Sequence, residues 1–297
     1  MNHKRILVAV SLTEGRDPAF ERALALAKTS GAELYLLHAV PADRPFSYRA
    51  AARLRRSIDL RERAEAAGVK VRMAEQHGDP AEIIVLHADA RPVDLIVMSS
   101  ARRTGWARLR QPSVAERVLR RTKRPTLVVP ADDSVEGSAF ENVLVATDLS
   151  PASRSLIESS LQVVGGDDRE VTVLHAVDTI EAAGAARNRA RWVVPEYRSH
   201  VLSDARRQLE DVMPPSLGTG VKPQLRVAAG SPAEAINGHA ADVNADLIVM
   251  GRSMRFMHLG STAVRVLRTT NRALLIVPPT AATQIIEAEQ SIHKRAA

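Results

Sequence analysis

Short apolar runs alternate along the chain with longer segments in which apolar positions recur at helical spacing. In the first half the apolar runs lie at 5–10, 33–40, 69–76, 93–98 and 125–130. The amphipathic segments between them lie at about 16–30, 47–67, 80–89 and 113–122. Strands that are apolar on both faces and are joined by helices predict a parallel sheet with helices on each side. The same order returns in the second half, with strands predicted at 141–147, 170–177, 221–228, 245–250 and 273–278.

The two halves are related by their residues as well as by this pattern, which indicates a tandem duplication. Leu37-His38-Ala39-Val40 returns as Leu174-His175-Ala176-Val177, 137 residues later. Asp94-Leu95-Ile96-Val97-Met98 returns as Asp246-Leu247-Ile248-Val249-Met250 after 152 residues, and Ser113 corresponds to Ser261 after 148. The changing offset indicates a 15-residue insertion within the second copy and a 4-residue deletion just after Met250.

We therefore predict one domain at 1–133 (copy one), a second at 139–280 (copy two) and a C-terminal helix or tail at 281–297. The polar stretch from Ala131 to Ser138 is the predicted linker. The predicted fold is α/β, with two tandem five-stranded parallel sheets that carry helices on both faces.

Composition narrows the possible chemistry. The chain has no cysteine, which excludes disulfides, thiolate metal sites and thiol catalysis. No apolar run approaches the roughly 18 residues that a membrane helix needs, so we expect a cytoplasmic protein. Residues 1–140 hold 24 Lys and Arg against 17 Asp and Glu, whereas residues 141–297 hold 17 of each, so the net charge of +7 belongs to copy one.

Ligands of such sheets bind beyond the carboxyl ends of the strands, so the residues at those ends are the candidate site. In copy two the first strand ends in Thr147-Asp148. A carboxylate at that point can accept hydrogen bonds from a ribose or an adenine amine. The alternative is a helix N-cap for the segment that starts at Pro151, a role for which Ser150 also competes.

The fourth strand of copy two ends in Met250-Gly251, and Gly260-Ser261-Thr262 then opens a helix. A glycine lets a ligand approach the backbone, and free N–H groups at a helix start favour phosphate. The alternative is an ordinary capped helix start.

Together, Asp148, Gly251 and Gly260 in this order resemble the universal stress protein family in its tandem two-domain form. The resemblance runs from Lys4 to Pro278 and implies a Rossmann-like nucleotide-binding fold. For copy two it implies ATP or ADP, with Mg²⁺ as a companion ion. The residues that it places around this nucleotide are Thr147 and Asp148 at the adenosine, Val177 along the adenine, and Gly251, Gly260, Ser261 and Thr262 around the phosphates. Arg252 could add positive charge to that group.

Both copies depart from the family motif G-x2-G-x9-G-[ST]. In copy two the second glycine is replaced by Met254, and the outer glycines are 9 residues apart instead of 13. In copy one Ser11 replaces the aspartate, and Ser99, Arg102 and Pro112 replace the glycines. We therefore expect a degenerate nucleotide site in copy one, where the loop from Arg102 to Arg110, with four arginines and Trp106, either binds an anion or a base or is simply solvated.

No catalytic constellation emerges. The chain has no G-x-x-x-x-G-K-[ST] phosphate loop, and its nine histidines form no H-E-x-x-H pair. His38 and His175 occupy equivalent positions, which favours a structural role over metal ligation. We expect no catalytic residue, no metal-ligating residue and no enzymatic activity, although slow ATP hydrolysis is not excluded.

The predicted function is that of a non-catalytic ATP- or ADP-binding regulator of the stress response, liganded in copy two. The alternative is a scaffold of the same fold that binds another ligand or a protein. Nucleic acid is an unlikely partner, because the arginines are scattered and aromatic residues are few. The resemblance also implies an intramolecular pseudo-dimer of the two copies and leaves a homodimer open. The insertion near Arg187 to Trp192 forms either a lid or an interaction surface.

Overall fold

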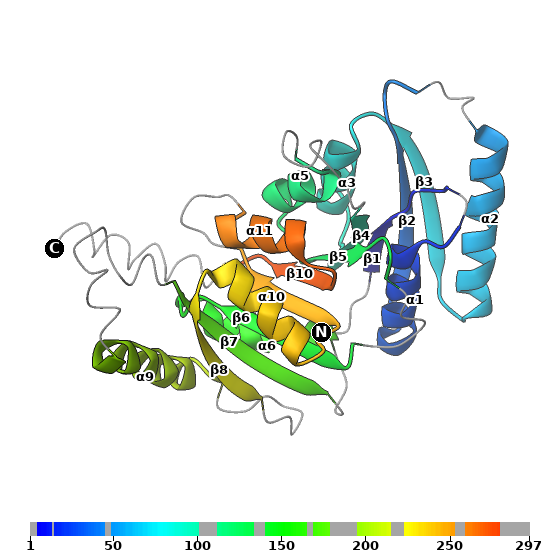
Figure 1. Cartoon of the computed structure of the whole chain (residues 1–297). Helices are drawn as coiled ribbons and strands as arrows, with labels where there is room; N and C mark the ends of the chain where they lie inside the picture. Colours follow the sequence, from blue (N-terminus) through cyan, green and yellow to red (C-terminus); the bar gives the residue numbers. More distant parts are fainter. Residues whose placement is uncertain are drawn as a thin grey trace. The chain divides into compact units, whose positions relative to one another are not determined.

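A computed structural model describes residues 5–13, 15–44, 49–100, 112–133, 140–164, 169–178, 195–214, 223–252 and 259–279 (Figure 1). The chain divides into two compact units. Unit 1 comprises Met1–Ala139 together with Asn271–Ile276, and unit 2 comprises Phe140–Thr270 together with Val277–Ala297. The predicted tail at 281–297, the loop from Arg102 to Arg110, the insertion near Arg187 and residue Met254 lie outside the described residues.

Unit 1 follows the predicted alternation of strands and helices. Its strands are β1 (Arg5–Ala9), β2 (Glu33–Val40), β3 (Val71–His77), β4 (Leu95–Ser100) and β5 (Thr126–Pro130). Its helices are α1 (Pro18–Ser30), α2 (Ala50–Ala66), α3 (Pro80–Asp89) and α5 (Val114–Arg121). The five strands are parallel in the order β3-β2-β1-β4-β5.

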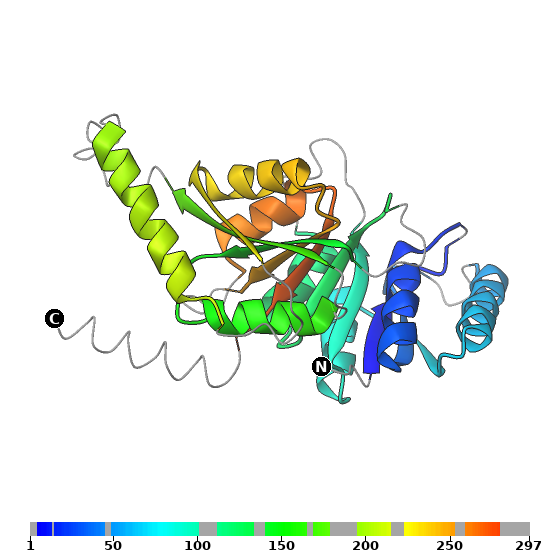
Figure 2. The ribbon, with the colours of Figure 1, turned by 90° about the horizontal axis from the view of Figure 1, so that it is seen from below.

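Unit 2 repeats this arrangement. Its strands are β6 (Asn142–Thr147), β7 (Glu170–Asp178), β8 (Gln224–Gly230) and β9 (Leu247–Gly251), parallel in the order β9-β6-β7-β8. Its helices are α6 (Ser153–Val164), α9 (Pro195–Asp211), α10 (Pro232–Asp242) and α11 (Ser261–Thr269). Figure 2 shows α6 on one face of this sheet and α10 with α11 on the other. The predicted α/β class with helices on both faces is confirmed.

The last strand, β10 (Ala273–Val277), adds a pairing that the sequence pattern does not reveal. Leu274, Leu275 and Ile276 pair in antiparallel register with Val128, Leu127 and Thr126 of β5. The apolar run predicts a buried strand at 273–278, and all five residues of β10 are indeed buried. An apolar run does not, however, specify the direction of the neighbouring strand.

The cores consist of aliphatic side chains from the central strands. In β1 Ile6, Leu7 and Val8 are fully buried, and in β6 Leu144 and Val145 are equally inaccessible. Runs that are apolar on both faces produce this result because helices cover both sides of each sheet. The first strand of each unit is therefore fixed at its centre, and its carboxyl end is positioned by the same packing.

The repeated aspartate of the Asp-Leu-Ile-Val-Met block hydrogen-bonds to the first residue of the neighbouring central strand in each unit. Asp94 Oδ2 accepts a hydrogen bond from the N–H of Arg5 at 3.0 Å, and the N–H of Asp94 donates to the Arg5 carbonyl at 3.0 Å. In unit 2 Asp246 Oδ1 accepts from Asn142 N–H at 3.2 Å, and its own N–H donates to the Asn142 carbonyl at 2.9 Å. Recurrence of this aspartate therefore has a structural cause.

The repeated histidines have an equally local role. Nδ1 of His38 lies 2.9 Å from the Val10 carbonyl oxygen, and Nδ1 of His175 lies 2.9 Å from the Thr147 carbonyl oxygen. A carbonyl only accepts, so Nδ1 carries the proton in both rings. Each histidine thereby ties the second strand to the chain just where the first strand ends, as the structural interpretation of the two histidines anticipates.

Candidate functional site

The strand register brings together the carboxyl ends of β6 and β9, which carry four of the predicted site residues. Ala146 pairs with Met250, so Thr147 and Gly251 lie at neighbouring strand ends. Asp148 and Arg252 follow directly. Val177 lies on β7, two residues beyond His175, which pairs with Thr147. Gly260, Ser261 and Thr262 begin α11, after residues 253–258, which the structure does not describe.

Thr147 is buried and its side chain shapes the turn that follows β6. Its Oγ1 donates to Ser153 Oγ at 2.6 Å and accepts from the N–H of Leu149 at 3.3 Å. The hydroxyl thus joins the strand end to the start of α6. Its described contacts are with the protein, so its role in ligand binding stays a prediction.

Asp148 is exposed at the same turn and presents its carboxylate at the surface. Oδ1 accepts a hydrogen bond from Ser150 N–H at 3.0 Å, an Asx turn, and Leu149 between them has a left-handed φ of 58°. Because α6 begins only at Ser153, this hydrogen bond is made outside the helix. The turn therefore accounts for the described hydrogen bond of Asp148 without an N-cap role.

Copy one builds the same backbone turn with a different side chain. Leu12 has a φ of 50°, close to that of Leu149, and Ser11 precedes it where Asp148 stands in copy two. Ser11 Oγ lies 2.9 Å from Thr13 Oγ1, and Ser11 N–H donates to Asp17 Oδ2 at 3.3 Å. Asp17 caps α1, and its burial raises the pKa of this carboxyl above its ordinary value. The turn survives in copy one, but the exposed carboxylate does not.

The ends of β4 and β9 differ in the same way. Ser99 of copy one turns its Oγ to the start of α1 and accepts the N–H of Ala19 at 3.3 Å. Gly251 occupies the equivalent position in copy two and is exposed. A Cβ placed on Gly251 would lie 3.4 Å from Leu156 Cδ2, an ordinary contact, so packing within the protein does not demand glycine here. A glycine at this position would, however, allow a ligand to approach the backbone closely.

The helices after these strands begin differently. Ser113 caps α5, and its Oγ accepts the N–H of Glu116 at 3.1 Å. Glu116 is buried in the first turn and pairs with Arg120 at 2.8 Å. In copy two Gly260 is the cap of α11, and no described side chain accepts a hydrogen bond from the first turn. Copy one therefore caps its helix with a serine hydroxyl and has a carboxylate in the first turn, whereas α11 has neither a side-chain cap nor an acidic residue in its first turn.

The α5 capping was missed by the sequence predictions, although a signal for it was present. Ser113-Val114-Ala115-Glu116 matches the S-x-x-E capping signature, whereas Val264 occupies the position of Glu116 in copy two. The partial positive charge at the start of α5 is thus balanced internally.

Arg252 follows Gly251 and places a cation beside the open strand end. Its backbone N–H donates to the Val277 carbonyl at 2.9 Å, which ties it to the end of β10. Arg252 is partly buried, and this burial lowers the pKa of its guanidinium below its ordinary value. A partly desolvated guanidinium interacts more strongly with an anion than a solvated one does.

Many arginines of copy one are engaged in ion pairs. Arg22 of α1 is almost fully buried and pairs with Asp133 at 2.7 Å, and Arg16 donates to the Asp133 carbonyl. Among the described residues, seven further arginines also pair with carboxylates within copy one, namely Arg5, Arg53, Arg56, Arg63, Arg72, Arg117 and Arg120. These pairs give individual arginines partners within the protein, but because each pair also uses a carboxylate, they leave the net charge of copy one unchanged.

The described residues also bear on metal binding and on membrane insertion. They contain no group of three or more His, Asp or Glu side chains that could hold a metal ion. Among them there is also no helix that is long and apolar enough to cross a membrane.

Comparison with known proteins finds similarity to universal stress proteins. The model of the universal stress protein family matches twice, at residues 2–130 and 139–278. A universal stress protein of Methanocaldococcus jannaschii is 32% identical over 143 residues, which cover 43% of this chain and 82% of that protein.

Solved structures agree on the fold. A universal stress protein from Archaeoglobus fulgidus has a TM-score of 0.66 at 21% identity, covering 95% of this chain and 98% of its own. A functionally unknown protein from Pseudomonas aeruginosa has a TM-score of 0.67 at 19% identity and covers 97% of both chains. At these identities the likeness establishes the fold and not the ligand.

Proposed function

The chain belongs to the universal stress protein family, and we propose that it is a regulator of the stress response that binds ATP or ADP in copy two only. The nucleotide lies beyond the carboxyl ends of β6, β7 and β9. Asp148 accepts hydrogen bonds from the adenosine, and Val177 lines the adenine. Thr147 lies with Asp148 at the adenosine, and Gly251, Gly260, Ser261 and Thr262 surround the phosphates, with Arg252 beside them.

One observation carries the restriction to copy two, namely the difference between the starts of α5 and α11. Free N–H groups at a helix start bind anions well. On α5 the Ser113 hydroxyl takes one of these groups and Glu116 supplies the negative charge. The described residues leave the start of α11 without such a cap. The exposed Asp148 and the side-chain-free Gly251 support the same conclusion, because copy one has an exposed serine without a carboxylate, Ser11, at the first position and a Ser99 hydroxyl that accepts the N–H of Ala19 at the second.

The residues that carry this proposal bind and orient a nucleotide, and they include no positioned general base. We therefore infer a non-catalytic, cytoplasmic regulator whose state depends on nucleotide, with Mg²⁺ as the companion ion of ATP. The domains proposed are 1–133 and 139–280. From the family resemblance we also propose a pseudo-dimer of the two copies.

Calorimetric titration of ATP and ADP into the full chain tests the proposal. We expect one nucleotide per chain. Asp148→Ala removes a charged hydrogen-bond acceptor and should weaken binding by about 10- to 100-fold. Gly260→Pro removes one N–H while its φ of −58° already suits proline, so the fold should survive. Ser11→Ala, the equivalent change in copy one, is the control and should bind as the wild type does.

The alternative function is a scaffold of the same fold that holds a different ligand or a protein. Absence of nucleotide binding by the wild-type chain would favour this alternative. Two nucleotides per chain, or weaker binding in Ser11→Ala, would contradict the assignment of the site to copy two.

A further inference from the structure

Helix α2 of copy one has an apolar exposed surface that its own fold does not require. The large apolar side chains that are exposed among the described residues are Leu54, Ile58 and Leu86, at 62%, 47% and 55%. Leu54 and Ile58 are four residues apart and therefore lie on one side of α2. On the opposite side Leu60 and Ala64 are fully buried. The helix lies along the edge strand β3 of the unit 1 sheet (Figure 1).

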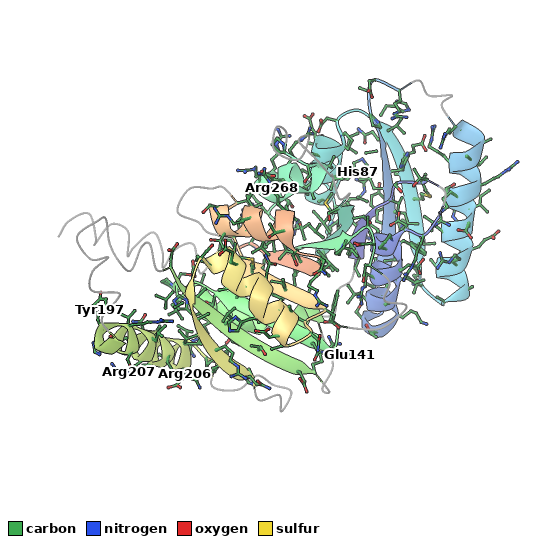
Figure 3. All side chains as sticks on the ribbon, viewed as in Figure 1. His87, Glu141, Tyr197, Arg206, Arg207 and Arg268 are labelled. Atoms are coloured by element: carbon green, nitrogen blue, oxygen red, sulfur yellow. The ribbon has the colours of Figure 1, made fainter. Side chains whose placement is uncertain are left out.

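Copy two contains a direct comparison for this surface. Helix α9 has 17 residues, as α2 has, and its buried Ala205 and Leu209 correspond to Leu60 and Ala64 when the helices are aligned end to end. In this alignment Leu54 and Ile58 correspond to Ser199 and Ser203, which are exposed. The polar character of α9 continues in Arg206 and Arg207, which extend from it in Figure 3. The same position in the fold thus accepts serine.

The charges around Leu54 and Ile58 are balanced but unevenly placed. The exposed side carries two arginines, Arg55 and Arg61, and two glutamates, Glu62 and Glu65, so its net charge is zero. Within the described part of the chain none of these four side chains has an ion-pair or hydrogen-bond partner. A neutral surface of this kind has no preference for a strongly acidic partner, a basic partner or an anionic membrane.

The order of the charges suggests the orientation of the partner. The first turn of α2 has no acidic residue, whereas Glu62 and Glu65 lie toward its carboxyl end. This order opposes the helix dipole, which favours acidic residues at the start of a helix and basic residues at its end. A second α2 in antiparallel orientation would place Arg55 of each helix next to Glu62 of the other, and the apolar side chains would meet between these pairs.

We propose that the chain self-associates through the α2 face, defined as Ala51, Leu54, Arg55, Ile58, Arg61, Glu62 and Glu65, with the α2 helices of two copies packed antiparallel about a two-fold axis. One helix face buries less area than a standard stable interface, so the dimer forms reversibly and depends on protein concentration. The proposal rests on the surface of copy one and is independent of nucleotide binding in copy two.

Sedimentation equilibrium of the full chain over a range of concentrations up to the millimolar range tests the apolar part. The average mass should rise from 32.2 kDa toward twice that value. The double variant Leu54→Ser/Ile58→Ser carries the residues of α9 and should remain at 32.2 kDa throughout. Leu86→Ser, on α3, is the matched control and should associate as the wild type does. A wild type that stays monomeric, or a dimer that persists in the double variant, overturns the proposal.

Charge reversal tests the two-fold arrangement. Arg55→Glu and Glu62→Arg each place like charges together and should weaken association about 5- to 10-fold. The combined variant Arg55→Glu/Glu62→Arg restores opposite charges across the axis and should return to near wild-type association. Failure of the combined variant to improve on the single changes overturns the antiparallel pairing, and circular dichroism confirms that each variant is folded.

Discussion

The N–H of Glu116 donates to Ser113 Oγ at 3.1 Å, and the first turn of α5 is thereby closed by its own side chains. The equivalent turn of α11 begins at Gly260, which has no side chain to offer. The two copies therefore differ in that the first turn of α5 has a side-chain cap and the first turn of α11 has none among the described residues.

Replacement of Ser113 by alanine should destabilise unit 1. Loss of an N-cap hydroxyl costs about 1 kcal/mol, because the N–H of Glu116 loses its acceptor. Ser261→Ala is the matched change on α11, where the cap is Gly260, and should alter the nucleotide-free protein by no more than about 0.5 kcal/mol. Urea denaturation followed by circular dichroism measures both. Equal losses of unfolding free energy in the two variants would show that the Ser113 cap stabilises α5 no more than Ser261 stabilises α11.

Gly251→Ser should fold normally and lose nucleotide affinity. The new Cβ would meet Leu156 Cδ2 at 3.4 Å, an ordinary contact, so the thermal midpoint should change little. The hydroxymethyl group, as at Ser99 of copy one, would occupy the strand end where the proposed phosphates lie. Calorimetry should show at least about a 10-fold loss of ATP affinity. Unchanged affinity in a folded Gly251→Ser variant would move the phosphates away from β9.

The sequence predicts the positions of the strands well, but it does not predict the long-range ion pairs and strand pairings that hold them together. Apolar runs place β2 at 33–40, as observed, and β4 within two residues of its observed bounds. Burial on both faces leaves a clear one-dimensional pattern. The Arg22–Asp133 pair joins residues 111 positions apart, so neither residue reveals its partner in the sequence. For the same reason the antiparallel neighbour of β10 cannot be deduced from its apolar run.

The candidate site is predicted only in part. Asp148 and Gly251 were selected from their places at strand ends, and the register of β6 and β9 puts those ends side by side. Whether a polar side chain at such an end faces outward depends on its tertiary contacts. Ser99 illustrates this, because it turns to Ala19 N–H, a group 80 residues away.

Removal of the Asp133 carboxylate should strongly destabilise copy one. The Arg22 side chain is 3% exposed and would lose its partner at 2.7 Å, and breaking a buried pair from one side typically costs about 3–5 kcal/mol. Asp59→Ala is the control, because Asp59 is 47% exposed and pairs with Arg56 at the surface, where the cost stays below about 1 kcal/mol. Chemical denaturation of Asp133→Ala and Asp59→Ala compares them. A small effect of Asp133→Ala would mean that other groups hold Arg22.

His87 should make the stability of the protein depend on pH near neutrality. Its Nδ1 lies 2.9 Å from the Tyr35 hydroxyl and 3.2 Å from Arg91, whose guanidinium can only donate. Nδ1 is therefore an acceptor, and Nε2 donates to Gln76 Oε1 at 2.5 Å. Burial, and to a lesser degree Arg91, lowers the pKa of His87 below its ordinary value.

The sign of this effect follows from proton binding. Below about pH 6.5 the unfolded chain takes up a proton at this histidine before the folded chain does. The contribution of His87 is thus fully present above that pH and is lost as the pH falls toward the lowered pKa of the folded state. His87→Gln should flatten the decline in unfolding free energy between about pH 7 and pH 5. A variant with the same slope as the wild type would contradict the neutral Nε2–H form.

Hydrogen exchange should distinguish the two helix starts when nucleotide is added. The first N–H groups of α11 have no partner within the helix, since the first helical bond runs from Val264 N–H to the Gly260 carbonyl at 3.0 Å. Phosphate oxygens that accept from these groups should slow their exchange in a peptide covering 259–267. A peptide covering 112–120 should not change, because Ser113 and Glu116 already occupy the start of α5. The Asp148→Ala variant at the same ATP concentration is the control for binding. Protection confined to α5, or none at α11 when calorimetry detects binding, would place the nucleotide outside the site proposed for copy two.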